Sequence, residues 1–97
     1  KDLSSRGIVF GKSGAGECIV ANKYKGVRAF LGINKENVTL ARQHNDANVL
    51  SLGSGFVTHE QAYELVKLFL ETPFSNEERH KRRIEKIREI EHTNVSK

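Results

Sequence analysis

A glycine-rich turn between an apolar run and a helix-like segment constrains this chain more than any other feature. Residues 7–10 (GIVF) are typical of a buried parallel strand, and residues 11–16 (GKSGAG) follow without a break. The glycines let backbone N–H groups crowd together and point one way, and the helix expected next adds its positive end. We therefore predict strand, loop and helix in that order, with a loop that holds an anion, either a phosphate or a developing enolate.

Two well-known glycine motifs do not fit this turn. A P-loop would need a glycine where the chain has Arg6, and a dinucleotide fingerprint starting at Gly14 would need one at Ile19. What remains distinctive is Glu17, a carboxylate in the first turn of the expected helix and next to the amide donors. A base beside an oxyanion hole favours proton abstraction, although spacing alone equally allows a carboxylate that only stabilises the helix dipole.

Apolar runs recur along the chain, and each is followed by a segment with helical character. This alternation predicts an α/β fold with a Rossmann-like parallel sheet, flanking helices and right-handed crossovers. The length of 97 residues bounds the chain to one small domain, residues 1–97. Ligands of open parallel sheets sit beyond the carboxyl ends of the strands, so the loops after the strands should share one rim. The runs are residues 7–10, 27–31 and 49–52, and the loops are residues 11–17, 32–34 and 53–55.

A further helix is expected from Thr58 to just before Pro73. Thr58 and Gln61 have the spacing of a capping box, and Pro73 ends the segment. The apolar residues inside it follow the spacing of one buried stripe. They are Ala62, Leu65, Val66, Phe69 and Leu70.

The last helix is expected over residues 76–91, opened by a second capping box at residues 75–78. Its three isoleucines form a narrow stripe among many charges, which indicates packing on another surface. Arg79 and Arg83 lie one turn apart there, so both guanidinium groups project from one face and suit a single phosphate. A basic run of this kind is also typical of a solvated helix face.

Composition narrows the partners without choosing among them. The net charge of +4 and the pI near 9.4 favour anionic ligands, which include sugar phosphates and nucleic acid. A single cysteine, Cys18, excludes an internal disulfide, and at a helix start it is usually a packing residue. No apolar run approaches the roughly 20 residues of a membrane span, so we expect a cytoplasmic protein without a membrane partner.

Six segments, taken together, resemble one known family. They are residues 11–17 (GKSGAGE), 21–23 (ANK), 26–29 (GVRA), 41–50 (ARQHNDANVL), 72–74 (TPF) and 79–83 (RHKRR). In this order they resemble the type B ribose-5-phosphate isomerases, which are grouped with the galactose-6-phosphate isomerase subunits. One branch of that family has a catalytic cysteine where this chain has Gly11. The branch that this chain resembles lacks it and uses a glutamate at the position of Glu17.

The resemblance implies an aldose–ketose isomerase that interconverts ribose 5-phosphate and ribulose 5-phosphate without a metal or another cofactor. It implies that Glu17 is the catalytic base and that His44 assists ring opening. The anion hole, with the Ser13 hydroxyl, would hold the enediolate. That hole comprises Lys12, Ser13, Gly14, Ala15 and Gly16.

The resemblance also implies how the substrate is bound. Asn45 would bind sugar hydroxyls, and Arg79 and Arg83 would bind the phosphate, usually in the neighbouring subunit's site. His80, beside them, is expected to be a further substrate-binding residue. The helix over residues 76–91 would pack on a partner subunit, so a homodimer or higher homo-oligomer is expected.

Two features depart from the family pattern. The chain begins at Lys1 without a methionine, and family members are longer, so we expect it to be the C-terminal portion of the fold without the first strand and helix. Gly55 stands where the family usually has an arginine of the phosphate site. Either Lys12 substitutes for it, or the substrate differs, or phosphate affinity is weak.

Two other functions remain as alternatives. The first is isomerisation of a six-carbon sugar phosphate, such as galactose 6-phosphate or allose 6-phosphate. The second is a nucleic-acid-binding module on the last basic helix, which the interleaved acids and the lack of an RNA-binding aromatic pattern disfavour. His59 and His92 receive no role, and the histidine spacing does not fit a structural zinc site.

Overall fold

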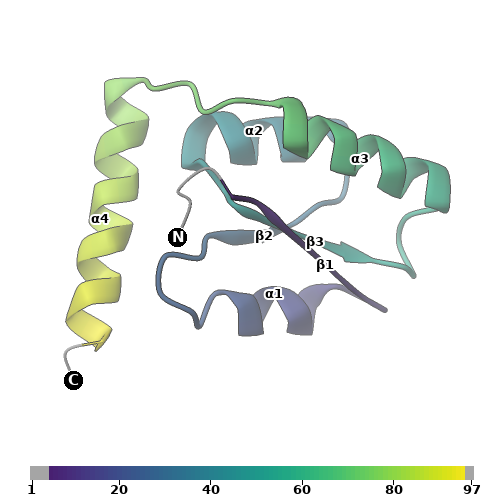
Figure 1. Ribbon diagram of the computed structural model, residues 1–97, viewed down its shortest axis with the longest axis horizontal. Helices are drawn as coiled ribbons and strands as arrows, with labels where there is room; N and C mark the ends of the chain where they lie inside the picture. Colours follow the sequence, from purple (N-terminus) through teal and green to yellow (C-terminus); the bar gives the residue numbers. More distant parts are fainter. Residues whose placement is uncertain (1–4, 96–97) are drawn as a thin grey trace.

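The computed structural model describes residues 5–95 as a three-stranded parallel sheet with helices on both faces (Figure 1). The elements are β1 (Gly7–Gly11), α1 (Ala15–Ala21), β2 (Ala29–Leu31), α2 (Lys35–Asn45), β3 (Val49–Gly53), α3 (His59–Glu71) and α4 (Glu78–Val95). Strands β1 and β2 both pair with β3, which lies between them. The predicted α/β class and parallel sheet are confirmed.

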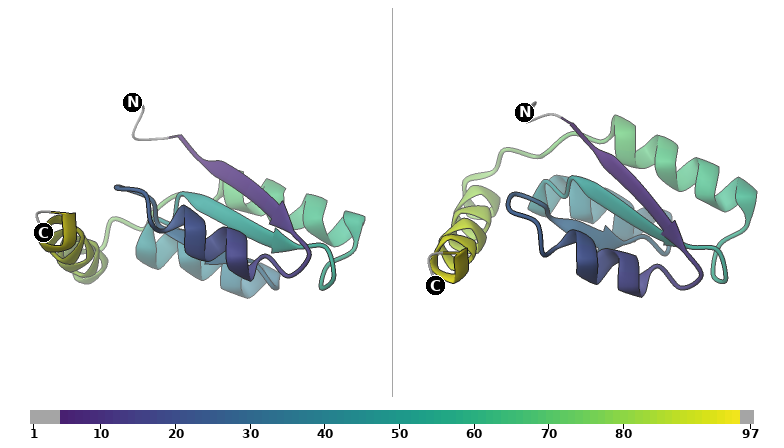
Figure 2. Two further views of the ribbon diagram at one scale, coloured as in Figure 1. Left: turned by 90° about the horizontal axis from the view of Figure 1, so that it is seen from below. Right: turned by 60° about the horizontal axis from the view of Figure 1, so that its bottom comes forward.

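β3 is the central strand because it is apolar enough to be buried on both faces. Leu50 and Leu52 are fully buried and pack with Val38 of α2 and Phe69 of α3 in one hydrophobic core. Helices α2 and α3 cover one face of the sheet, and α1 covers the other (Figures 1 and 2). Burial of a side chain as large as Phe69 contributes about 1.5 to 3 kcal/mol, so this layer carries much of the stability of a small domain.

The predicted capping box of α3 is confirmed. Thr58 Oγ1 accepts the Gln61 amide at 3.1 Å, and Gln61 Oε1 accepts the Thr58 amide at 2.8 Å. The predicted buried stripe of α3 is confirmed except at Leu70, whose side chain is 51% exposed. Leu70 lies about 100° round the helix from the centre of the buried residues, beyond the width of the stripe.

The second capping box is wrong. Helix α4 begins at Glu78 and ends at Val95, and the Ser75 hydroxyl accepts the Glu77 amide at 3.3 Å instead of capping Glu78. The same hydroxyl lies 2.8 Å from Nδ1 of His80, so a contact with the helix that follows replaces the expected cap. Asn76, with φ 63°, turns the chain just before the helix.

Helix α4 lies beside the amino ends of the strands, next to the last turn of α2 (Figures 1 and 2). Ile84 is buried, whereas Ile87 and Ile90 are 40% and 63% exposed. Near its end, Glu91 Oε2 accepts the Gly26 amide at 2.8 Å, which fastens α4 to the loop before β2. No helix within residues 5–95 has both the length and the apolar character that a membrane crossing requires.

Candidate active site

The glycine-rich loop after β1 is fastened to the end of β3. The Ser54 amide donates to the Gly11 carbonyl, and the Gly55 amide donates to the Lys12 carbonyl, both at 2.8 Å. Two of the three loops predicted to share a rim therefore bond directly to each other. The rim lies at the carboxyl ends of the strands, where ligands of parallel sheets bind.

Two glycines allow this close approach. Gly14 caps α1 with φ 80°, and a β-carbon there would lie 2.7 Å from Leu31 at the end of β2. A β-carbon at Gly53 would overlap the backbone of Ser13. Both positions therefore require glycine, one for its backbone conformation and both for space.

Ser51 of β3 fixes the glycine-rich loop through a hydrogen bond, a role that no sequence motif indicated. Its side chain is fully buried in β3, and its hydroxyl donates to the Gly14 carbonyl at 2.6 Å. A buried hydroxyl without a partner is costly, so this bond both satisfies Ser51 and fixes the loop. The available signal was one polar residue within the otherwise apolar run Val49–Gly53.

Glu17 lies where a base for this rim is expected. It is half-buried in the first turn of α1, and its carboxylate lies against Gly11, the last residue of β1. Backbone N–H groups of a first helical turn have no acceptor within the helix. A carboxylate beside such donors can remove a proton from a carbon whose neighbouring oxygen the donors stabilise.

Cys18 does not have the environment of an activated thiol. It is partly buried, and this burial raises the pKa of the thiol above its usual value. Its sulfur accepts only a long contact from Asn22 Nδ2, at 3.8 Å. A nucleophilic cysteine needs a lowered pKa, so the geometry agrees with the packing role that the sequence indicated.

A second group of predicted residues meets where the last turn of α2 contacts the start of α4. The His44 and His80 rings stack with centroids 4.2 Å apart and an interplanar angle of 28°. His80 is only 2% exposed, and Nδ1 of its ring lies 2.8 Å from the Ser75 hydroxyl. Ser75, which the sequence analysis assigned only to a helix cap, therefore belongs to this group.

Charges around His80 act together with its burial. Burial lowers the pKa of His80 below its ordinary value, and His44 and Arg79 lower this pKa further. Glu77, which accepts from Arg79 Nε at 2.9 Å, acts in the opposite direction. Arg79 and Arg83 are both exposed on one face of α4, as their spacing predicted.

Two arginines hold the last turn of α2 in place. Arg28 Nε donates to the Asn45 carbonyl at 3.0 Å and also lies 3.5 Å from Asp46. Arg42, 2% exposed, donates to Asp46 Oδ1 at 2.8 Å and to the Thr72 carbonyl at 2.8 Å. These side chains fix the backbone that carries the predicted substrate residue Asn45. The sequence feature that could have indicated Arg42 was its spacing of four residues from Asp46.

The two groups of predicted residues lie at opposite ends of the sheet. Helix α2 leaves the carboxyl end of β2 and returns the chain to the amino end of β3, so its last turn lies far from the rim. Figure 1 shows α4 on the side away from the loop that precedes α1. One chain therefore assembles a base with its anion hole at one end and a histidine–arginine group at the other. The family resemblance indicated such a separation only for Arg79 and Arg83.

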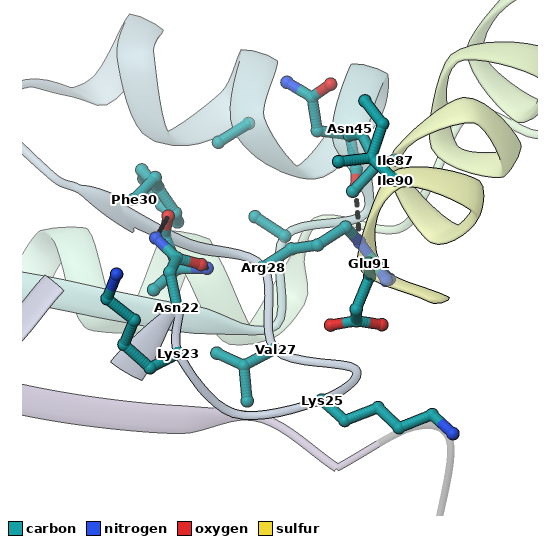
Figure 3. Close-up of a pocket in the computed structure, with 13 residues that line it drawn as sticks. Asn22, Lys23, Lys25, Val27, Arg28, Phe30, Asn45, Ile87, Ile90 and Glu91 are labelled. Carbon is teal, nitrogen blue, oxygen red and sulfur yellow. Dashed lines mark hydrogen bonds between the residues drawn. The ribbon is translucent and has the colours of Figure 1, made fainter. Parts of the chain in front are cut away.

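Two cavities lie against the sheet. Glu17 borders an apolar groove of about 530 Å³ between β1 and α1, which extends to Gly7 and Val49 at the amino ends of their strands. A cavity of about 770 Å³ lies between α4 and the amino end of the sheet, with Ile87, Ile90 and Glu91 on its α4 side (Figure 3). Asn45 lines this second cavity, whereas neither the rim residues nor His44, His80, Arg79 and Arg83 do. Among residues 5–95 no three His, Cys, Asp or Glu side chains gather as metal ligands would.

Known proteins share both this sequence and this fold. A family model described as Ribose/Galactose Isomerase matches residues 1–87. Ribose-5-phosphate isomerase B of Mycobacterium leprae is 44% identical over 92 residues, which cover 95% of this chain and 57% of the relative. The type B ribose 5-phosphate isomerase of Trypanosoma cruzi superposes with a TM-score of 0.90 at 46% identity, over 92% of this chain and 59% of that one.

A third similar protein was solved with a sugar phosphate. The Mycoplasma genitalium ribose-5-phosphate isomerase B, with bound ribulose-5-phosphate, superposes with a TM-score of 0.85 at 45% identity. The match covers 90% of this chain and 57% of that one. The chain thus spans between 57% and 59% of the length of these three relatives.

Proposed function

The chain belongs to the ribose/galactose isomerase family, and from this membership we propose that its protein interconverts ribose 5-phosphate and ribulose 5-phosphate as a cytoplasmic homodimer. One observation carries the proposal: the Glu17 carboxylate lies beside Gly11 and the glycine-rich loop at the carboxyl ends of the strands. A base next to a row of amide donors is the arrangement that proton transfer between two adjacent sugar carbons requires.

The reaction starts with opening of the sugar ring. Ribose 5-phosphate is mainly a furanose, so the bond between C1 and the ring oxygen must break before C2 can lose its proton. His44 acts as a general acid and gives a proton to the ring oxygen, while the C1 hydroxyl proton passes to water and C1 becomes the aldehyde carbon. Asn45, the next residue, binds sugar hydroxyls and orients the ring for this step.

Isomerisation follows at the open-chain aldehyde. Glu17 takes the proton from C2, and the electron pair moves to the aldehyde oxygen to give an enediolate. The loop amides of residues 12–16 and the Ser13 hydroxyl stabilise that oxygen, which favours the transition state over the substrate. The C2 hydroxyl proton then passes to O1, C2 becomes a ketone, and Glu17 returns its proton to C1.

The phosphate binds to Arg79 and Arg83. Their guanidinium groups lie one helical turn apart and are exposed, so both can contact one dianion. Because this group and Glu17 lie at opposite ends of one chain, we place each complete site between two copies. The rim of one copy then faces the histidine–arginine group of the other.

A second substrate class deserves the same assay. Gly55 presents no side chain at the rim, where the resemblance leads one to expect an arginine, and this leaves room for a longer sugar. Galactose 6-phosphate and allose 6-phosphate are the six-carbon candidates. A preference for either would keep the mechanism and change only the depth of the site.

The test is conversion of ribose 5-phosphate by the native protein in the presence of EDTA, with the variant Glu17→Gln. We expect wild-type activity to survive chelation and the variant to lose about 10³-fold in kcat, since the amide cannot accept the proton. Glu64→Gln is the matched control, because Glu64 makes only an exposed ion pair with Lys35 at 3.7 Å. Conversion by Glu17→Gln at the wild-type rate would refute the base assignment.

A further inference from the structure

The stacked histidines differ in how much of each ring solvent can reach. His80 is 2% exposed, whereas His44 is only half-buried. His80 is thus the inner ring of the pair and has almost no surface to offer to a phosphate. His44 is the outer ring, and one of its faces rests on His80 at a centroid distance of 4.2 Å.

Ser75 fixes the orientation of the inner ring. Its oxygen accepts the Glu77 amide at 3.3 Å, and its hydroxyl hydrogen is free to be donated to Nδ1 of His80, 2.8 Å away. The Ser75 amide in turn donates to the Gln43 carbonyl at 3.2 Å, next to His44 in the chain. The inner ring and the backbone under the outer ring are therefore held by one residue.

This bonding allows a neutral inner ring. When Nδ1 accepts from Ser75, His80 carries its proton on the other nitrogen and is uncharged. Burial, the neighbouring His44 and the cations Arg79 and Arg83 also disfavour a charge on His80 by lowering its pKa, whereas Glu77 favours one. A neutral aromatic face can support a cationic ring, whereas two stacked cations would repel each other.

From these contacts we propose that His80 is a positioning residue for His44, a flat aromatic platform held by Ser75 that orients the His44 ring toward the sugar. The inference rests on the proposed isomerase function, because it assigns His80 a role in ring opening. It replaces direct substrate binding by His80, which the resemblance suggested. His80 touches neither the substrate nor a reacting atom and acts through His44 alone.

Two substitutions of His80 separate a platform from a ligand. His80→Phe keeps a flat aromatic face without ionisable nitrogens, and His80→Leu keeps bulk without the flat face. We expect His80→Phe to retain most of the wild-type kcat and His80→Leu to lose about tenfold, because a ring that is no longer oriented donates its proton less effectively. KM for ribose 5-phosphate should stay within about twofold in both variants, since neither loses a substrate contact.

A smaller substitution, at Ser75, tests the same role with less risk of misfolding. Ser75→Ala removes one hydroxyl and leaves both rings in place, and we expect a loss of about threefold in kcat with an unchanged KM. Thermal unfolding of all three variants identifies any that do not fold. A tenfold rise of KM in both His80 variants would mean that His80 binds substrate. Equal kcat values in His80→Phe and His80→Leu would show that the flat face of the ring does not orient His44. Either result overturns the proposal.

Proton NMR of the purified chain tests the platform without turnover. Stacking places the His44 ring protons over a neighbouring ring, which shifts their resonances upfield. We expect this shift in the wild type and in His80→Phe and its loss in His80→Leu, with His44→Gln used to assign the signals. If the wild type fails to isomerise any sugar phosphate, the proposed isomerase function is wrong. The upfield shifts of the His44 ring protons still decide whether His80 positions His44.

Discussion

The carboxylate of Glu17 occupies the space that a β-carbon at position 11 would need, so Gly11 and Glu17 form one structural unit. Only glycine at the end of β1 leaves room for the carboxylate in its present place. A side chain at position 11 would therefore move the Glu17 carboxylate out of this place.

The first prediction follows from this contact. Gly11→Ala should displace the Glu17 carboxylate and lower kcat for ribose 5-phosphate by about 10²-fold, because a base misplaced by about 1 Å loses that much. Gly7→Ala is the control on the same strand, since a β-carbon there would lie 3.5 Å from Val49 in ordinary contact. Wild-type kcat in Gly11→Ala would show that Glu17 has space to move without loss.

The second prediction concerns the stability that Arg42 provides. Arg42→Met removes donors from the Thr72 and Ala47 carbonyls, at 2.8 and 2.7 Å, and from Asp46. The buried Ala47 carbonyl then lacks a partner and the Thr72 carbonyl keeps only a long bond from Arg6 at 3.4 Å, so we expect the free energy of unfolding to fall by about 3 kcal/mol in urea titrations. Arg82→Met on the exposed face of α4 should change it by less than about 0.5 kcal/mol.

The third prediction is a loss of stability in mild acid that depends on His80. Its pKa in the folded chain lies below the ordinary value of 6.5, first because of burial and then because of His44, Arg79 and Arg83. As the pH falls below about 6.5, the unfolded chain binds a proton at His80 before the folded chain does. Unfolding is favoured in that window, so the urea midpoint should fall between pH 7 and pH 5.5.

His80→Phe should make that pH dependence shallower, because phenylalanine binds no proton in either state. His59→Phe, at an exposed position of α3, is the control and should leave the slope as it is. The same slope in His80→Phe and the wild type would assign the acid sensitivity to other groups. The comparison needs only unfolding curves at several pH values.

The fourth prediction tests the glycine that departs from the family pattern. Gly55→Arg places a cation at the rim, and we expect KM for ribose 5-phosphate to fall about tenfold, the effect of one charge-assisted phosphate contact. A β-carbon at Gly55 would lie 3.1 Å from the Lys12 carbonyl oxygen, so the loop must yield slightly. Gly55→Met imposes the same strain without the charge. Equal KM values for the two variants would place the phosphate away from this loop.

Local patterns in the sequence predicted those parts of the fold that depend on neighbours in the chain. The Thr58 cap and the loop before α1 depend on residues within a few positions, so spacing was enough to predict them. The similar pattern at Ser75 failed because its hydroxyl contacts His80 and its amide bonds Gln43. Which of several partners a serine takes is decided by packing between helices, and spacing does not contain that information.

The candidate site was predictable only in pieces for the same reason. Residue types and motifs indicated Glu17, His44 and Arg79 one by one. The strand–helix–strand order implies that α2 carries His44 to the amino end of β3, away from the rim, but the residue types and motifs that indicated each residue do not contain its place in the fold. Ser51 and Arg28 were missed because each acts through a bond to the backbone of a distant segment.

The direction of α2 has a consequence for mixtures of defective chains, which is the fifth prediction. In the proposed dimer each copy gives its base to one site and its acid to the other. A dimer of one Glu17→Gln chain and one His44→Gln chain then has one site with both substitutions and one site with the native Glu17 and the native His44. Two inactive preparations, unfolded and refolded together, should regain about a quarter of the wild-type activity, whereas sites confined to single chains would regain none.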